Sequence, residues 1–224
     1  MAFKSLFKKY DRLLVFDTET TGLYPDRDQI IEFAAVVVEK KGVVDTFDEL
    51  IELAPGTSIP ENITALTGIT NEAVAQRGIS KTALRAHLAH WLSANTLLVA
   101  YNAHFDLCFT YYLLHQDFLD YKLQGKDKLD LLTVYKDRRP YPHKLTHAIE
   151  AYGLSDKVVN SHRAIDDVLA TVEVMKAMEE ERDDFLRYVN LFGYNPNYPK
   201  PRPGIRSITY KPQPYNSTKL LYEE

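Results

Sequence analysis

Five residues of the sequence are of the types that bind divalent cations and deprotonate a water molecule. They are Asp17, Glu19, Asp106, His162 and Asp167. Asp17 and Glu19 follow an apolar run at 13–16, and side chains alternate between the faces of a strand, so both carboxylates should point to the same side. Neighbouring carboxylates repel each other unless a cation or a proton lies between them. Taken alone, the pair favours an N-cap cluster that leads into the turn 20–22, and a cation site is the alternative.

The segment after His162 has the pattern of a helix. Apolar residues recur with helical spacing from Ile165 to Met175. On this helix Asp167 shares a face with small and apolar residues, where an unpaired carboxylate is costly, whereas Asp166 lies in a row of charged residues. We therefore expect Asp167, and not Asp166, to reach the site. His162 lies about 140° from Asp167 around a continuous helix axis, so it should occupy the loop before the helix. The alternative is a histidine of the surface or of the helix terminus.

The remaining acidic candidate, Asp106, follows the apolar run 97–100 and belongs to the first turn of a helix predicted over 104–117. It shares a helix face with Phe109 and Leu113, so it should point inward rather than toward water. The helix dipole stabilises an acid at this place, which is the structural explanation for it. The dipole does not explain why the residue faces the core, so Asp106 is also a candidate for the site.

The three motifs together resemble the DEDDh class of 3′-to-5′ exonucleases, whose members include the proofreading (epsilon-type) subunit of bacterial replicative DNA polymerase. The first motif of that family is similar to residues 16–23 and the second to residues 102–106. The third has the form His-x-Ala-x-x-Asp, found here at 162–167. The resemblance covers residues 10–180, and the three motifs in this order are far more specific than any one of them.

Two residues depart from the family pattern. Tyr101 stands where many members carry histidine. Thr67, within the segment 63–70, stands where a histidine often precedes Gly-Ile. Neither belongs to the five catalytic positions, but we expect the second to alter contacts with the terminal nucleotide.

The resemblance implies metal-assisted hydrolysis of phosphodiester bonds. Asp17 would bridge two Mg²⁺ or Mn²⁺ ions, hard cations that prefer oxygen ligands, about 4 Å apart. Glu19 and Asp167 would complete one metal site, and Asp106 would assist the other. His162 would accept the proton of the attacking water. The residues implied around the terminal nucleotide are Thr20, Gly22, Leu23, Asn102 and Phe105.

The expected substrate is the 3′ end of single-stranded or frayed DNA, which releases nucleoside monophosphates. Two alternatives stay open: an exoribonuclease with the same five residues, and a non-catalytic module associated with a polymerase. A DNA polymerase is a candidate partner. The net charge of −4 excludes a broad basic surface but not a small cleft for one strand end. The basic stretch from Lys136 to Lys144 is either a solvated turn or a loop that contacts phosphates.

Composition predicts a globular protein with one substantial domain and an extension, since 45% of the 224 residues are hydrophobic. No apolar run has membrane-spanning length, and residues 1–5 lack the apolar core of a signal peptide. The single cysteine, Cys108, cannot form an internal disulfide and should be buried in the core. We therefore expect a cytoplasmic protein without a membrane partner.

The order of patterns predicts an α/β fold with a mixed sheet flanked by helices. The family resemblance makes this a ribonuclease-H-like fold. The acidic residue Asp130 lies on a late extended segment and is expected to be structural. The expected strands are 12–18, 29–40, 43–53, 96–100 and 127–132, and the expected helices are 71–76, 81–94, 104–117, 144–152 and 164–190.

The sequence changes character near its end, so we divide it into an exonuclease domain, 1–190, and a proline- and tyrosine-rich C-terminal extension, 191–224. Six of the eleven prolines follow residue 195, and no helical period survives there. The segment 206–210 has strand composition, but the neighbouring prolines would confine it to a sheet edge. A flexible tail is the default expectation, and a clamp for nucleic acid or a partner-binding peptide is the alternative.

Overall fold

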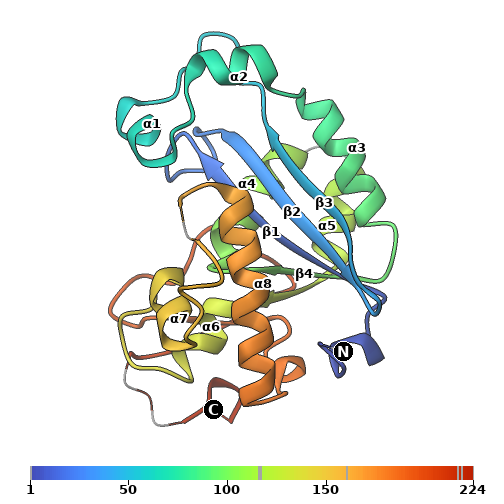
Figure 1. Ribbon diagram of the computed structural model, residues 1–224, viewed down its shortest axis with the longest axis vertical. Coiled ribbons are helices and arrows are strands. Elements are labelled where there is room, and N and C mark those ends of the chain that lie inside the picture. Colours follow the sequence, from blue (N-terminus) through green and yellow to red (C-terminus); the bar gives the residue numbers. More distant parts are fainter. Residues whose placement is uncertain (1, 116–117, 160, 216, 218, 224) are drawn as a thin grey trace.

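A computed structural model describes residues 2–115, 118–159, 161–215, 217 and 219–223. Its centre is a five-stranded sheet in the order β3-β2-β1-β4-β5 (Figure 1). The strands are β1 (Arg12–Thr20), β2 (Ile30–Glu39), β3 (Gly42–Leu50), β4 (Thr96–Ala100) and β5 (Asp127–Asp130). The pairs β1–β2 and β2–β3 are antiparallel, whereas β1–β4 and β4–β5 are parallel. The predicted mixed α/β sheet is confirmed.

Helices cover both faces of the sheet, and α8 crosses it in front in Figure 1. On that side lie α6 (Leu131–Lys136), α7 (Leu145–Ala151) and α8 (Ala164–Glu181). On the other side lie α3 (Lys81–Trp91), α4 (Ala103–Leu114) and α5 (Phe118–Gly125). The short helices α1 (Glu61–Thr67) and α2 (Asn71–Arg77) lie beyond one end of the sheet. None of the described helices is both long and apolar enough to cross a membrane.

Strand β1 separates two hydrophobic cores. Leu13 and Val15 pack in the core under α8, whereas Leu14 and Phe16 pack in the core under α4. This alternation follows from the two-residue period of a strand. Since Asp17 and Glu19 continue the odd-numbered series, they emerge on the α8 side at the end of the strand.

The last long helix is shorter than the sequence pattern predicts. The helix was expected over 164–190, but α8 ends at Glu181, and a 3-10 turn, Phe185–Arg187, follows it. The guanidinium of Arg138 donates to the carbonyl oxygens of Met178 and Arg182, so it binds the open end of the helix. Phe185 then turns into the core. The short helices α1, α5 and α6 were also not predicted.

The C-terminal extension is folded, so the expectation of a flexible tail is wrong for its described residues. Strands β6 (Leu191–Tyr194) and β7 (Thr209–Pro212) form a two-stranded parallel sheet, in which each strand is an edge. Pro212 is therefore tolerated, and the predicted strand is present but shifted toward the C-terminus. Phe192 and Ile208 join the core under α4, and Leu221, in a final 3-10 turn, joins the core under α8. The N-terminal segment adds one more 3-10 turn, Leu6–Lys8.

Candidate active site

Three of the predicted carboxylates meet where β1 ends against the start of α8. Asp17, Glu19 and Asp167 each offer a carboxylate oxygen, and these oxygens lie within 4.8 Å of one another. Asp167 belongs to the first turn of α8 and is buried. Its neighbour Asp166 instead accepts a hydrogen bond from the Ser161 hydroxyl. The structure therefore brings Asp167 into the cluster and leaves Asp166 outside it, as the helical face predicts.

Asp106 approaches from the other side of the sheet. It lies in the first turn of α4 and is buried, as its inward face predicts. Its Oδ1 accepts hydrogen bonds from the Thr18 backbone N–H at 2.9 Å and from the Thr18 hydroxyl at 2.7 Å. Thr18 points away from Asp17 and Glu19 because strand side chains alternate. Thr18, which lies between Asp17 and Glu19 in the sequence, thus holds the carboxylate of Asp106 beside these two acids.

The cluster is electrostatically unfavourable without a counter-charge. Burial, followed by the charges of Asp106 and Asp167, raises the pKa of Asp17 well above its usual range. Burial and then the charge of Asp167 raise the pKa of Glu19 to about 8. Burial raises the pKa of Asp106 to about 7, against the effect of its hydrogen bonds from Thr18. An all-oxygen set of this charge fits a hard divalent cation such as Mg²⁺ or Mn²⁺.

A fifth acid, Glu32, belongs to this site and was missed in the sequence. It lies on β2 directly opposite Glu19 and is completely buried. Its carboxylate accepts from Arg163, at 2.9 Å from Nε and also from Nη2, and from the Ala164 backbone N–H at 2.8 Å. It therefore binds the first N–H group of α8, that of Ala164. The signal was a glutamate inside the apolar stretch 30–38, where a buried charge needs a partner.

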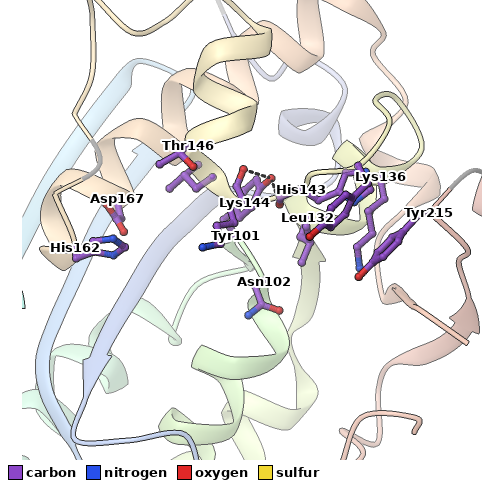
Figure 2. A pocket seen from close by; sticks show the side chains of 12 residues that line it. Tyr101, Asn102, Leu132, Lys136, His143, Lys144, Thr146, His162, Asp167 and Tyr215 are labelled. Carbon is purple, nitrogen blue, oxygen red and sulfur yellow. Dashed lines mark hydrogen bonds between the residues drawn. The ribbon is translucent and has the colours of Figure 1, made fainter. Parts of the chain in front are cut away.

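His162 lies on the loop before α8, as predicted. Its backbone is left-handed, with φ of 58°, and the residue is exposed. Figure 2 shows its ring beside Asp167, and both residues line one cavity. A left-handed non-glycine residue is uncommon and needs support from its surroundings. That support comes from the residues on either side, since Arg163 binds Glu32 and Ser161 binds Asp166.

Three of the predicted nucleotide contacts, Thr20, Gly22 and Leu23, lie at the end of β1 and in the turn after it. Leu23 is 73% exposed, so its side chain is free to contact a ligand. The Thr20 hydroxyl donates to the Gly22 carbonyl at 2.6 Å and closes the turn. A Cβ atom on Gly22 would lie 2.4 Å from Oδ2 of Asp28. The local structure therefore explains why threonine and glycine occupy positions 20 and 22, because Thr20 and Gly22 shape the turn that presents Leu23.

The other predicted contacts lie at the start of α4. Asn102 is the exposed N-cap residue, with a left-handed φ of 67°, and its carbonyl accepts from the Phe105 N–H at 3.0 Å. Phe105 is half-buried against Phe109, with ring centroids 4.9 Å apart. The turn at Asn102 places Phe105 on the same helical turn as Asp106.

The two departures from the family pattern have different surroundings. The Thr67 hydroxyl donates to the Ile63 carbonyl and accepts from the Ile69 N–H, so it is occupied within the end of α1. The Tyr101 hydroxyl donates to the His143 carbonyl at 2.9 Å and ties β4 to the segment before α7. Thr67 is therefore structural, and Tyr101 shapes the wall next to the site.

Two further predictions are confirmed at nearby residues. Asp130 caps α6 by accepting from the Leu132 and Thr133 N–H groups, and it also accepts from the Ala103 N–H at 3.0 Å. It is structural, as expected. Cys108 is buried, and burial raises the pKa of its thiol to about 12, so it is a packing residue rather than a nucleophile.

Comparison with known proteins agrees with this geometry. A PolC-type DNA polymerase III from Clostridium perfringens is 33% identical over 178 residues, which are 77% of this chain and 12% of the relative. The 3′-5′ exonuclease DinG of Bacillus subtilis is 36% identical over 165 residues, or 71% of this chain and 17% of the relative. The chain therefore spans less than a fifth of the length of these relatives.

Solved structures give the same fold. Escherichia coli exonuclease I in complex with a dA16 oligonucleotide aligns with a TM-score of 0.68 at 23% identity, covering 80% of this chain and 42% of that one. This likeness confirms the exonuclease, ribonuclease-H-like fold. A family profile described as Exonuclease, of the RNase T type, matches residues 14–175. Because that match includes all five predicted catalytic residues, which lie at one end of the sheet, the chain belongs to the RNase T-type family of exonucleases.

Proposed function

We propose that the protein removes nucleotides from the 3′ end of single-stranded DNA by metal-dependent hydrolysis. The observation that carries the proposal is the convergence of three carboxylates within 4.8 Å, beside Asp106 and the exposed His162. The names of the relatives support DNA as substrate, since one is a 3′-5′ exonuclease and others are DNA polymerases. The structural neighbour from E. coli holds an oligonucleotide.

The five residues would divide the work as follows. Asp17 would hold two cations, shared with Glu19 and Asp167 on one side and with Asp106 on the other. Two Mg²⁺ or Mn²⁺ ions supply charge that acidifies the attacking water and stabilises the departing 3′ oxygen. His162 accepts the proton of that water, and its exposed loop lets it turn toward the cluster. Leu23, Phe105 and Asn102 would contact the terminal nucleoside.

A DNA polymerase partner is the second part of the proposal. The PolC-type relatives contain a segment similar to this chain within a much longer polymerase. By analogy with these relatives, this chain would act beside a polymerase. Such a role would be carried out in the cytoplasm. Copurification of a DNA polymerase with the tagged protein tests this part separately from the activity.

The division of the chain is also proposed. Residues 1–190 would form the exonuclease unit and residues 191–224 an extension that completes it. The family match, which ends at residue 175, supports this division.

The activity is tested with matched DNA and RNA oligonucleotides that carry a 5′ label. We expect a ladder that shortens from the 3′ end in Mn²⁺, no cleavage in excess chelator, and slower cleavage of a 3′-phosphorylated strand. The Asp17→Asn variant is the inactive control, with a rate lower by at least about a hundredfold. Internal cuts in circular single-stranded DNA would contradict an exonuclease, and faster loss of the RNA would make RNA the preferred substrate.

A further inference from the structure

A cavity of about 550 Å³ begins at the carboxylate of Asp167. Figure 2 shows His162 and Asp167 at one end and Tyr215, from the C-terminal extension, at the other. Its volume lies in the range of ligand-binding pockets and has room for about one or two nucleotides. Asn102 lines it but Leu23 and Phe105 do not, so the cavity adjoins the place proposed for the terminal nucleoside without including it.

Two lysines line the cavity, and Asp167 is the acid among its lining residues. Lys136 and Lys144 both line it, and among the described residues neither ammonium group forms an ion pair. The two arginines that lie between these lysines in the sequence do form ion pairs. Arg138 pairs with Asp184, and Arg139 pairs with Glu181. Burial lowers the pKa of Lys136, and the charge of Asp130 opposes this effect only in part, so the ammonium group is costly to bury without an ion-pair partner. A phosphate group would compensate both lysines.

Aromatic side chains form the far wall of the cavity. The rings of Tyr141 and Tyr215 have centroids 4.7 Å apart, and the ring of His143 lies 5.5 Å from that of Tyr215. Tyr141 is 61% exposed, although a side chain of this kind is usually partly covered. Burial lowers the pKa of His143, so the histidine adds an aromatic face rather than charge. Exposed tyrosine rings beside unpaired lysines are typical of surfaces that bind single-stranded nucleic acid.

Specific hydrogen bonds hold the wall in place. The Tyr101 hydroxyl donates to the carbonyl oxygens of His143 and Lys144, at 2.9 and 3.3 Å. The buried Gln213, two residues before Tyr215, donates from Nε2 to the Thr133 carbonyl at 2.9 Å. The departure of Tyr101 from the family pattern and the folding of the extension therefore both build this cavity.

We propose that this cavity, called here the upstream subsite, binds the DNA strand immediately 5′ of the scissile phosphate. Phosphates would contact Lys136 and Lys144, and a base would stack on Tyr141 and Tyr215. The inference rests on the proposed function. It follows from the continuity of the strand: if the terminal nucleoside lies between Leu23 and Phe105, the rest of the strand must pass the carboxylates, and the cavity begins at one of them, Asp167.

Two substrates separate the subsite from the catalytic site. One is the decamer dT10, and the other is thymidine 5′-(4-nitrophenyl phosphate), which has a scissile phosphodiester but no upstream nucleotide. We expect Tyr141→Ala and Tyr215→Ala each to lower kcat/KM on dT10 by about 5- to 150-fold, the effect of one base–aromatic stack. Hydrolysis of the nitrophenyl ester should not change. The matched control is Tyr121→Ala, because Tyr121 is 81% exposed and does not line the cavity.

The lysines are tested through salt. Lys136→Met and Lys144→Met should each reduce the slope of log(kcat/KM) on dT10 against log[salt] by about 0.7, the value for one phosphate contact on a single strand. Lys41→Met, on the β2–β3 hairpin, is the control. A wild-type protein that cleaves neither substrate would refute the proposed function itself. A wild-type protein that cleaves both, with tyrosine variants that match it on dT10 or lose both activities equally, would overturn the upstream subsite.

Discussion

At the scale of single residues, His162 is the only one of the five catalytic candidates whose side chain is not a carboxylic acid. We expect His162→Ala to lower kcat by about a hundredfold to ten-thousandfold, because it removes the acceptor of the proton. Metal binding should persist, since the carboxylates are untouched. Single-turnover kinetics give the rate, and the rise of the melting temperature with added Mn²⁺ reports metal binding. If the variant lost the single-turnover rate and the Mn²⁺-dependent rise in melting temperature to the same extent, His162 would support the metal site instead.

The carboxylates should make stability depend on pH when no metal is bound. The pKa of Glu19 is raised to about 8 and that of Asp106 to about 7, whereas carboxyl groups in an unfolded chain have pKa values of about 4. Between these values the folded state binds more protons than the unfolded chain, so the free energy of unfolding falls as pH rises from about 5 to about 8. Denaturation in chelator at several pH values measures this. Glu19→Gln should flatten the dependence, and a stability that rises over this window would contradict it.

At the scale of elements, Glu32 connects β2 to the start of α8. We expect Glu32→Gln to lower kcat by about 10- to 100-fold with little change in KM, because Arg163 loses its charged partner and the loop with His162 loses its support. The matched control is Glu49→Gln, on the neighbouring strand β3, where the side chain is exposed. Full kcat in Glu32→Gln would show that the ion pair is not needed to position the loop.

At the scale of the whole molecule, the extension is part of the folded unit. We expect a chain that ends at residue 190 to melt at a much lower temperature or not to fold. It loses the buried side chains Phe192, Ile208 and Leu221, each worth about 1.5–3 kcal/mol, out of a typical stability of about 5–15 kcal/mol. Circular dichroism melting measures the effect. A graded variant, Leu221→Ala, should cost about 2–5 kcal/mol. Wild-type melting of the truncated chain would show that residues 1–190 are independent.

Local patterns in the sequence determined much of this protein. The alternation along β1 placed Asp17 and Glu19 on one face, and the helical period of α8 selected Asp167 over Asp166. The same period placed His162 on a loop. Such patterns are readable because side-chain direction depends on residues a few positions away. The mixed sheet followed from the order of the strand and helix patterns.

Only the tertiary structure decided which distant residues meet. The pair of Glu32 and Arg163 is separated by 131 residues, and that of Thr18 and Asp106 by 88. No period connects such partners, since their contact depends on the path of the whole chain. For the same reason, the sequence did not reveal that the extension is folded. Its prolines and tyrosines resemble those of a disordered tail, and only the structure shows which of its side chains are buried. The far wall of the cavity includes Tyr215 only because that extension packs beside α6.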